Sequence, residues 1–311
     1  MCMPDPSYVS LAAFAATFAE RDDARPPAWV HPAGQPLQAF RGTPLAERLE
    51  EVLDTVVALQ RAEWLQDGVY LGPRTFGEAY RDLLETARAL GIAVPPAVVA
   101  SCGMGAQGTF GTDDRPFLLL SSFFFGGAAD EGERRFLLGR LCGTIRAGQV
   151  TGSTLYAALV DHDGIRKVAR RTLGPTLEVV LAPLSLGARL ALSRWHRAAE
   201  LTADRAGLVA CRDLDAARRA LLRIALGLHP RITPEDYLEQ LRGAGTRDAP
   251  GRWAEALASQ PWLHKRMEAL DLFGRSTVYA QSGVEAGGAA EGPLLDPEEL
   301  TRRTDLLLRV G

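Results

Sequence analysis

The sequence predicts an α+β protein that is mostly helical and carries one small mixed sheet. Most of the chain places apolar residues three or four positions apart, which is the spacing of amphipathic helices. Short apolar or β-branched runs separated by glycines are concentrated between residues 92 and 122, as is typical of strands. The 311 residues, of which 47% are hydrophobic, are sufficient for one sizeable core.

The front of the chain is expected to be entirely helical. Helices are predicted over residues 8–21, 44–65 and 75–91. A proline-rich stretch, residues 24–36, connects the first two. In the third helix, Thr75 and Glu78 have the spacing of a capping box, and Gly91 marks the end.

A small sheet and a further helix are expected next. The strands are predicted over residues 92–101, 106–110 and 115–122. Residues 130–148 then return to helical spacing, with an apolar stripe formed by Phe136, Leu137, Leu141 and Ile145. Acidic residues stand at the start of this helix, where the helix dipole favours negative charge.

The rest of the chain is again predicted to be helical. The helices cover residues 175–210 and 213–227, pieces of 228–275, and a tail helix over 296–310. Small residues over 282–293 indicate a flexible linker before the tail helix. We therefore expect an N-terminal helical region (1–91), a central domain (92–281), and a linker with a C-terminal helix (282–311).

Composition narrows the possible partners and the compartment. The net charge of −3 gives no electrostatic footprint for nucleic acid. Four scattered cysteines contain no CxxC pair, so neither a zinc knuckle nor a disulfide framework is predicted, and reduced thiols fit a cytoplasmic protein. Arginine supplies 33 of the 35 basic residues, which indicates a GC-rich bacterial genome.

No segment of the sequence predicts a membrane span or a signal peptide. The most apolar stretch, residues 176–192, contains Glu178, Pro183 and Arg189 and is shorter than the roughly 20 apolar residues that cross a bilayer. The apolar run 117–129 is shorter still. The N-terminus lacks the basic region that opens a secretory signal.

Two segments together resemble a known enzyme family. ERRFLLGRLCGTIRAGQV (133–150) is followed about sixty residues later by WHRAAELTADRAGL (195–208). This order resembles the HtpX-like and prenyl-protease zinc metallopeptidases, family forty-eight of the gluzincins, over residues 92–275. Their first helix has the form V-L-G-H-E-L-G-H-I-x-x-G-H and their second W-x-R-x-x-E-x-x-A-D-R-x-G. The second motif is matched by Trp195, Arg197, Glu200, Ala203, Asp204, Arg205 and Gly207.

The resemblance implies a zincin-like metallopeptidase fold and a defined chemistry. In the family, two histidines four residues apart bind one zinc ion, and the glutamate between them acts as general base on the metal-bound water. A glutamate on the second helix is the third ligand, which leaves the fourth position for water. An aspartate four residues later orients a ligating histidine.

Placed on this pattern, the sequence has lost its catalytic groups. Arg140 stands at the first histidine, Leu141 at the general base and Thr144 at the second histidine, whereas Glu200 and Asp204 match the third ligand and the orienting aspartate. Arginine stays protonated and has no lone pair for zinc, and leucine carries no proton. We therefore expect a degenerate active site with no metal, no cofactor and no catalytic residue.

Replacement groups are scarce but leave an alternative open. The histidines are dispersed, and only His196, four residues before Glu200, has ligand spacing. A zinc endopeptidase with non-standard ligands is thus the alternative function. We interpret Cys142 and Cys211 as small buried residues. The glycine-rich stretch 101–111 is expected to form a turn between strands. The arginine-rich run 166–171 is expected to form a solvated helix face.

The altered site suggests a binding protein. A carboxylate left in a dry pocket without its cation is costly, so we expect Arg140 to pair with Glu200 or Asp204; otherwise Arg140 turns to solvent and Glu200 pairs with Arg197 or Arg205. The leading hypothesis is a pseudopeptidase that acts as a scaffold or adaptor for a protein partner. The strand near 106–111 can accept an extended segment through backbone hydrogen bonds alone. A third possibility is that the N-terminal and tail helices mediate assembly with a partner.

Overall fold

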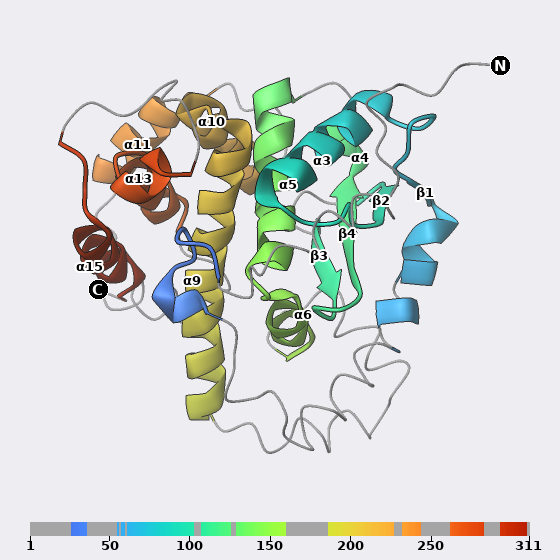
Figure 1. The fold of residues 1–311 in the computed structure, drawn as a ribbon, viewed down its shortest axis with the longest axis horizontal. Coiled ribbons are helices and arrows are strands. Elements are labelled where there is room, and N and C mark those ends of the chain that lie inside the picture. The colour runs from blue at the N-terminus through green and yellow to red at the C-terminus, as the bar shows by residue number, and fades with distance from the viewer. Residues whose placement is uncertain are drawn as a thin grey trace.

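The computed structural model describes residues 26–35, 55, 57–59, 61–102, 107–125, 129–159, 186–226, 232–243, 262–282 and 293–309. Two long helices, α5 (Glu131–Arg146) and α9 (Leu186–Cys211), pack side by side at the centre (Figure 1). A small sheet lies on one side of them, and the helices described between Leu214 and Leu308 gather on the other. The predicted α+β, mostly helical class is thereby confirmed.

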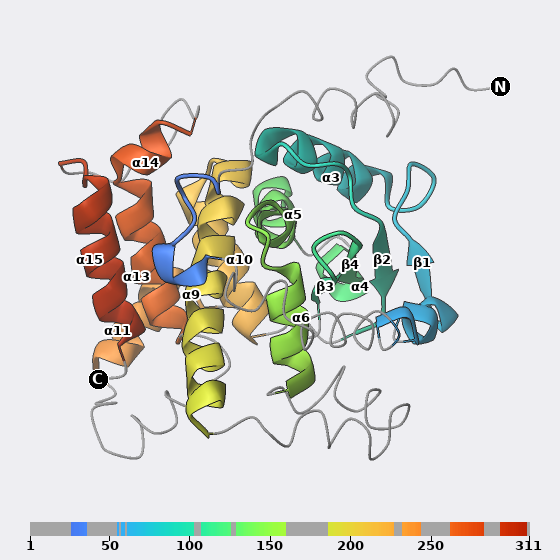
Figure 2. The same cartoon turned by 60° about the horizontal axis from the view of Figure 1, so that its bottom comes forward.

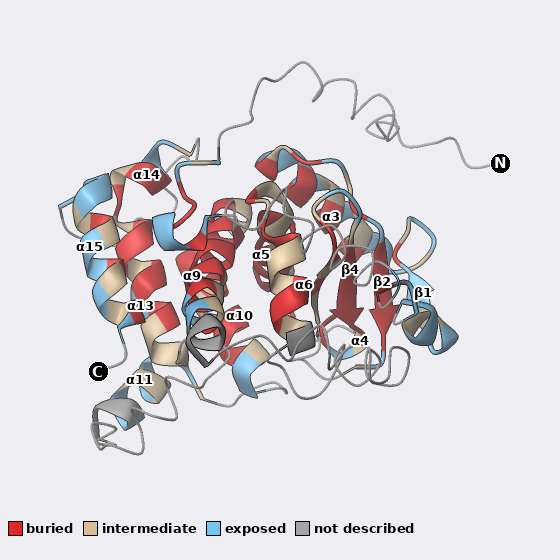
Figure 3. Ribbon diagram, turned by 90° about the horizontal axis from the view of Figure 1, so that it is seen from below, coloured by how far each residue is buried: buried red, intermediate tan, exposed pale blue. Residues whose placement is uncertain are grey.

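The sheet is mixed and has four strands in the order β1-β2-β4-β3. The strands are β1 (Gly68–Tyr70), β2 (Ala97–Ala100), β3 (Gly108–Gly111) and β4 (Pro116–Ser121). The central pair β2 and β4 is parallel, and both edge strands are antiparallel to their neighbours. Every residue of β2 is buried, as are all residues of β4 after Pro116, which explains their continuous apolar sequences (Figure 3). The three predicted strands are confirmed within a few residues.

Strand β1 corrects the expectation of an entirely helical front. It follows a helix that the structure describes at residues 55, 57–59 and 61–66, and it pairs Val69 with Val99 of β2. Three residues are too few to show the alternation that reveals a strand in the sequence. Val69 and Tyr70 are also exposed, so burial gives no pattern either.

Helix α3 (Gly77–Leu90) ends as predicted and begins differently. Gly91 terminates it in the left-handed conformation, with φ 69°. The predicted capping box is wrong, because the residue before the helix is Phe76, at φ 53°, and no side chain caps the first turn. The hydroxyl of Thr75 instead donates a hydrogen bond to the carbonyl of Tyr70, at 2.6 Å.

Small residues bring α5 and α9 into close contact. A Cβ atom on Gly139 would lie 2.6 Å from the Cβ of Ala210, and one on Gly207 would lie 2.7 Å from the ring of Phe136. Gly143 likewise faces Ala206. At the start of α5, Asp130 and Glu133 form a capping box. The crossing therefore places side chains of α5 directly against the sequence motif carried by α9.

Of the remaining helices, the four that begin at Leu214, Pro234, Leu263 and Pro297 agree with predicted segments, whereas the three that begin at Ser122, Val150 and Thr277 were not predicted. They are α4 (Ser122–Phe125), α6 (Val150–Leu159), α10 (Leu214–Leu226), α11 (Pro234–Gly243), α13 (Leu263–Gly274), α14 (Thr277–Ala280) and α15 (Pro297–Leu308). The predicted helix 8–21, the first part of helix 175–210, the run 166–171 and most of linker 282–293 lie outside the described residues. The three-region division stays a prediction.

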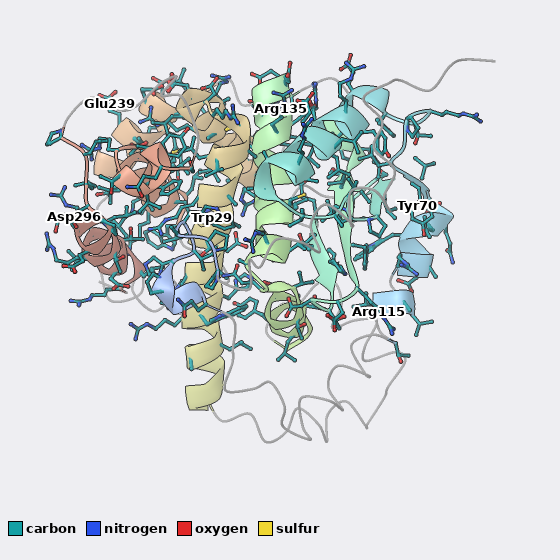
Figure 4. All side chains as sticks on the ribbon, in the orientation of Figure 1. Trp29, Tyr70, Arg115, Arg135, Glu239 and Asp296 are labelled. Carbon is teal, nitrogen blue, oxygen red and sulfur yellow. The ribbon has the colours of Figure 1, made fainter. Side chains whose placement is uncertain are left out.

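A segment near the N-terminus crosses the face of α9, and we call residues 26–35 the strap. It contains the short helix η1 (Pro32–Gly34), and Figure 4 shows its Trp29 beside α9. The indole N–H of Trp195 donates to the carbonyl of Gln35, and the amide of His31 donates to the hydroxyl of Thr202. Among the described residues, no helix is long and apolar enough to cross a membrane.

Candidate functional site

Arg140 of α5 holds both carboxylates of the α9 motif. Glu200 and Asp204 are four residues apart, so they share the face of α9 that Arg140 reaches. The guanidinium Nη2 lies 2.6 Å from Oε2 of Glu200, and Nε lies 2.6 Å from Oδ1 of Asp204. The predicted pairing of Arg140 is confirmed, and its guanidinium contacts both Glu200 and Asp204.

A second arginine completes the cluster from a helix that the motif analysis did not include. Nε and Nη2 of Arg266 in α13 donate to Oδ2 and Oδ1 of Asp204, at 2.8 and 2.7 Å. Its Nη2 also lies 3.7 Å from Oε2 of Glu200. In the sequence Arg266 is one charged residue in an amphipathic helix, and no local signal marks it as buried. We call Arg140, Glu200, Asp204 and Arg266 the motif cluster.

The motif cluster is sealed from water on the Asp204 side. Asp204 is 1% exposed, and burial alone would raise the pKa of its carboxyl. The charges and hydrogen bonds of Arg266 and Arg140 outweigh burial and hold that pKa below its usual range. Burial likewise opposes the charge of Arg266, but Asp204 and Glu200 raise its pKa overall. Two arginines thus face two carboxylates, so the formal charges of the motif cluster balance.

Neither remaining position of the first motif offers an acid or a base. The side chain of Leu141 is an alkyl group, and its backbone carbonyl accepts a hydrogen bond from the hydroxyl of Thr109 in β3, at 2.9 Å. The hydroxyl of Thr144 donates to the carbonyl of Arg140 within the same helix, at 3.2 Å. Thr109 therefore ties the edge strand directly to the helix that carries Arg140.

The other candidates are structural. The imidazole of His196 stacks on the ring of Tyr156 in α6, with centroids 3.9 Å apart. Burial raises the pKa of the Cys142 thiol and raises that of the Cys211 thiol to about 12. A reactive cysteine needs a lowered pKa. In the glycine-rich stretch, Gly108 begins β3 and residues 103–106 lie outside the described residues. The stretch joins two strands, as expected.

The residues of the motif cluster do not fit a zinc ion. Guanidinium groups already bind the oxygens that would be ligands, and each guanidinium carries a fixed positive charge that would repel a metal. Throughout the part of the chain that the structure describes, no three His, Cys, Asp or Glu side chains are grouped so as to hold a metal ion. The roles assigned to the five motif positions remain a prediction from the alignment.

Two packed helices with this motif, set beside a small mixed sheet, define a metallopeptidase-like protein of the zincin class. Residues 142–272 match the family model of peptidase family M48, so this part of the chain is similar to that family. The match contains Glu200, Asp204 and Arg266 and begins just after Leu141. No curated protein matches the chain, and no solved structure does.

Proposed function

We propose that this chain is a non-catalytic member of peptidase family M48 that serves as a scaffold for a protein partner. One observation carries the proposal: the guanidinium of Arg140 lies 2.6 Å from both Glu200 and Asp204. By the motif resemblance, Arg140 stands at the position of a zinc ligand, two residues before the segment that the family model matches. A permanent cation on a side chain thereby supplies the charge that the two carboxylates require.

This exchange explains why the carboxylates persist without a metal. A buried carboxylate needs a cation and hydrogen bonds, or its desolvation destabilises the fold. Arg140 provides one charge-assisted hydrogen bond to each acid, and Arg266 provides two more to Asp204. The cluster then stabilises the crossing of α5 and α9 as a structural element.

The loss of the general base supports the same conclusion. Hydrolysis of a peptide bond through a metal-bound water needs a group that takes the proton from that water. We expect Leu141 at that position from the motif resemblance, and leucine has no titratable atom. Binding, by contrast, needs neither base nor metal, because an extended peptide can add to the edge strand β3 through backbone hydrogen bonds.

The test is the metal content and the activity of the purified full-length protein. We expect far less than one zinc per chain by mass spectrometry after incubation with zinc, and no cleavage of casein above that of the Glu200→Gln variant. One tightly bound zinc per chain, with cleavage that a chelator abolishes and Glu200→Gln lacks, would overturn the proposal in favour of a peptidase with unusual ligands.

A restored motif provides the matched control. The triple variant Arg140→His, Leu141→Glu, Thr144→His returns two imidazoles at i and i+4 and the glutamate between them. If the alignment is right, this variant binds zinc under conditions in which the natural sequence does not. Binding by neither protein would mean that these positions do not correspond to the family's metal site.

A further inference from the structure

The outer edge of β3, where the proposed partner segment would add, can be defined from the register. Gly108 pairs with Leu119 and Phe110 with Phe117, while Thr109 stands opposite Leu118. The amide of Leu118 donates to the carbonyl of Pro96, so the backbone of Leu118 faces β2. In an antiparallel pair the hydrogen-bonding direction alternates. The backbone groups of Thr109 and Gly111 therefore point away from β4, toward the outer edge.

Helix α6 already lies on this edge. The amide of Gly111 donates to the hydroxyl of Thr154 in α6, at 3.1 Å, and this contact is buried. Thr154 is 0% exposed and Thr109 is 7% exposed, so the edge is covered and not open to solvent. A side-chain hydroxyl of α6 thus takes the place that a carbonyl of an added strand would occupy.

The start of α6 is fixed by the turn that follows β3. The carboxylate of Asp113 accepts hydrogen bonds from the amide of Val150, at 2.8 Å, and from the hydroxyl of Thr151, at 3.2 Å. The amide of Asp113 donates to the same hydroxyl, at 3.0 Å. Asp113 acts as a helix cap supplied from outside the helix, and it couples the position of α6 to β3.

On its other side, α6 packs against the motif helix. Gly152 lies against the indole of Trp195, where a Cβ atom would clash with the ring. One turn later Tyr156 stacks on His196, which precedes Glu200 by one turn of α9. Figure 2 shows α6 between α9 and β3. Helix α6 therefore contacts both the edge strand β3 and the helix that carries Glu200 and Asp204.

The sequence of α6 makes it dependent on these contacts. Its first five residues are Val150, Thr151, Gly152, Ser153 and Thr154, all of which favour helix less than alanine does. A ten-residue helix with such a start is unstable in isolation. Segments held mainly by docking contacts open locally at a lower free energy than the core.

We propose that α6 is a lid over the outer edge of β3, and that an extended protein segment pairs with Thr109 and Gly111 only when α6 has moved away. This inference rests on the proposed binding function and adds its regulation. The lid predicts that weakening the α6 contacts exposes β3 without unfolding the core.

Hydrogen exchange of the full-length protein measures the opening. Thr154→Val removes the acceptor of the Gly111 amide while keeping the shape of the side chain, and Asp113→Ala removes the cap. We expect each variant to exchange at least tenfold faster in residues 108–111 and 150–159, with α3 and α10 unchanged. The matched control is Thr301→Val. The hydroxyl of Thr301 donates a hydrogen bond to the carbonyl of Pro297 in the same helix, at 2.8 Å, far from β3 in the sequence. Uniform acceleration, or none at β3, overturns the lid.

A peptide-binding measurement tests the lid proposal separately from the proposed binding function. The probe is a fluorescent peptide with the sequence of β4, PFLLLS, between lysines, because this sequence pairs in antiparallel register with the inner edge of the same strand. We expect Thr154→Val to bind it at least tenfold more tightly than the natural sequence or Thr301→Val. Equal binding by all three overturns the lid and supports binding. Faster exchange without binding by any of them supports the lid and overturns strand addition.

Discussion

Helix α5 carries a charge cluster toward each end, and the two clusters differ in their exposure to water. Toward the C-terminal end, the motif cluster joins Arg140 to two carboxylates and a second arginine in the interior. At the N-terminal end, Arg134 and Arg135 bind Asp82 of α3, and Arg223 of α10 binds Glu133. Figure 4 shows Arg135 at this end of α5.

The N-terminal cluster opens to solvent at its rim. The side chain of Arg135 is 29% exposed and its partner Glu85 is 50% exposed. A second partner, Glu131, lies 2.6 Å away one helical turn earlier and is more exposed still. Only Glu133 and Arg223 are both buried. In the motif cluster, by contrast, the most exposed side chain is Glu200, at 17%.

The comparison shows that the same residue types have different energetic roles at the two ends. An ion pair exposed to water is screened and contributes little, because each ion keeps most of its hydration. A buried pair has lost that hydration, so removing one partner leaves an uncompensated charge. We therefore expect the response to mutation to decrease from the motif cluster to the rim of the N-terminal cluster.

The largest effect is expected for Asp204→Asn. This change removes the charge that Arg140 and Arg266 share while keeping the size of the side chain, so two buried guanidiniums lose their main partner. We expect the free energy of unfolding to fall by about 3–5 kcal/mol, measured by urea denaturation at pH 7. A loss below about 1 kcal/mol would mean that the two ends of α5 are energetically alike.

The next effect concerns His31 of the strap, whose protonation in acid is expected to lower the free energy of unfolding by about 3 kcal/mol. This contribution must be subtracted before the two clusters are compared at low pH. The buried Nδ1 of His31 accepts a hydrogen bond from the amide of Ala33. Burial, and then the charge of Arg205, lower the pKa of His31 to about 3. Asp305 lies 3.7 Å from Nε2 on the other side.

The free energy of unfolding is expected to fall in acid because the unfolded chain binds a proton more readily than the folded one. Below pH 6.5 the unfolded chain binds a proton at His31 that the folded chain does not, so stability falls as the pH is lowered, by about 1.4 kcal/mol per pH unit and about 3 kcal/mol by pH 4. His31→Asn keeps an acceptor for Ala33 and cannot be protonated. We expect urea titrations between pH 7 and 4 to show this decline in the natural sequence and a much flatter curve in the variant. Parallel curves would exclude His31 as the source.

The smallest effect is expected for Arg135→Ala at the rim of the N-terminal cluster. Glu85 and Glu131 remain hydrated when their partner is lost, and Arg134 still binds Asp82 at 2.7 Å. We expect a loss of less than about 1 kcal/mol, reduced further in 0.5 M salt. A salt-insensitive loss as large as that of Asp204→Asn would contradict the distinction between rim and interior.

Much of the motif cluster could be anticipated because its residues follow a motif. Glu200 and Asp204 are spaced to share a helix face, and Arg140 stands in a segment whose glycines permit close approach to that face. Arg266 could not be anticipated, because it belongs to neither motif and only the packing of α13 on α9 brings it to Asp204. Strand β1 escaped detection for a similar reason, since its pairing with β2 and not its own sequence makes it a strand.

The sequence by itself predicted the long helices α5, α9 and α10 and the three longer strands, because periodicity and residue chemistry are local properties. The tertiary structure decided which charges meet, how dry their surroundings are and that α6 covers the outer edge of β3. Those outcomes depend on distances between segments far apart in the chain, and the strength of an ion pair or the access to a strand edge depends on the water that those distances exclude.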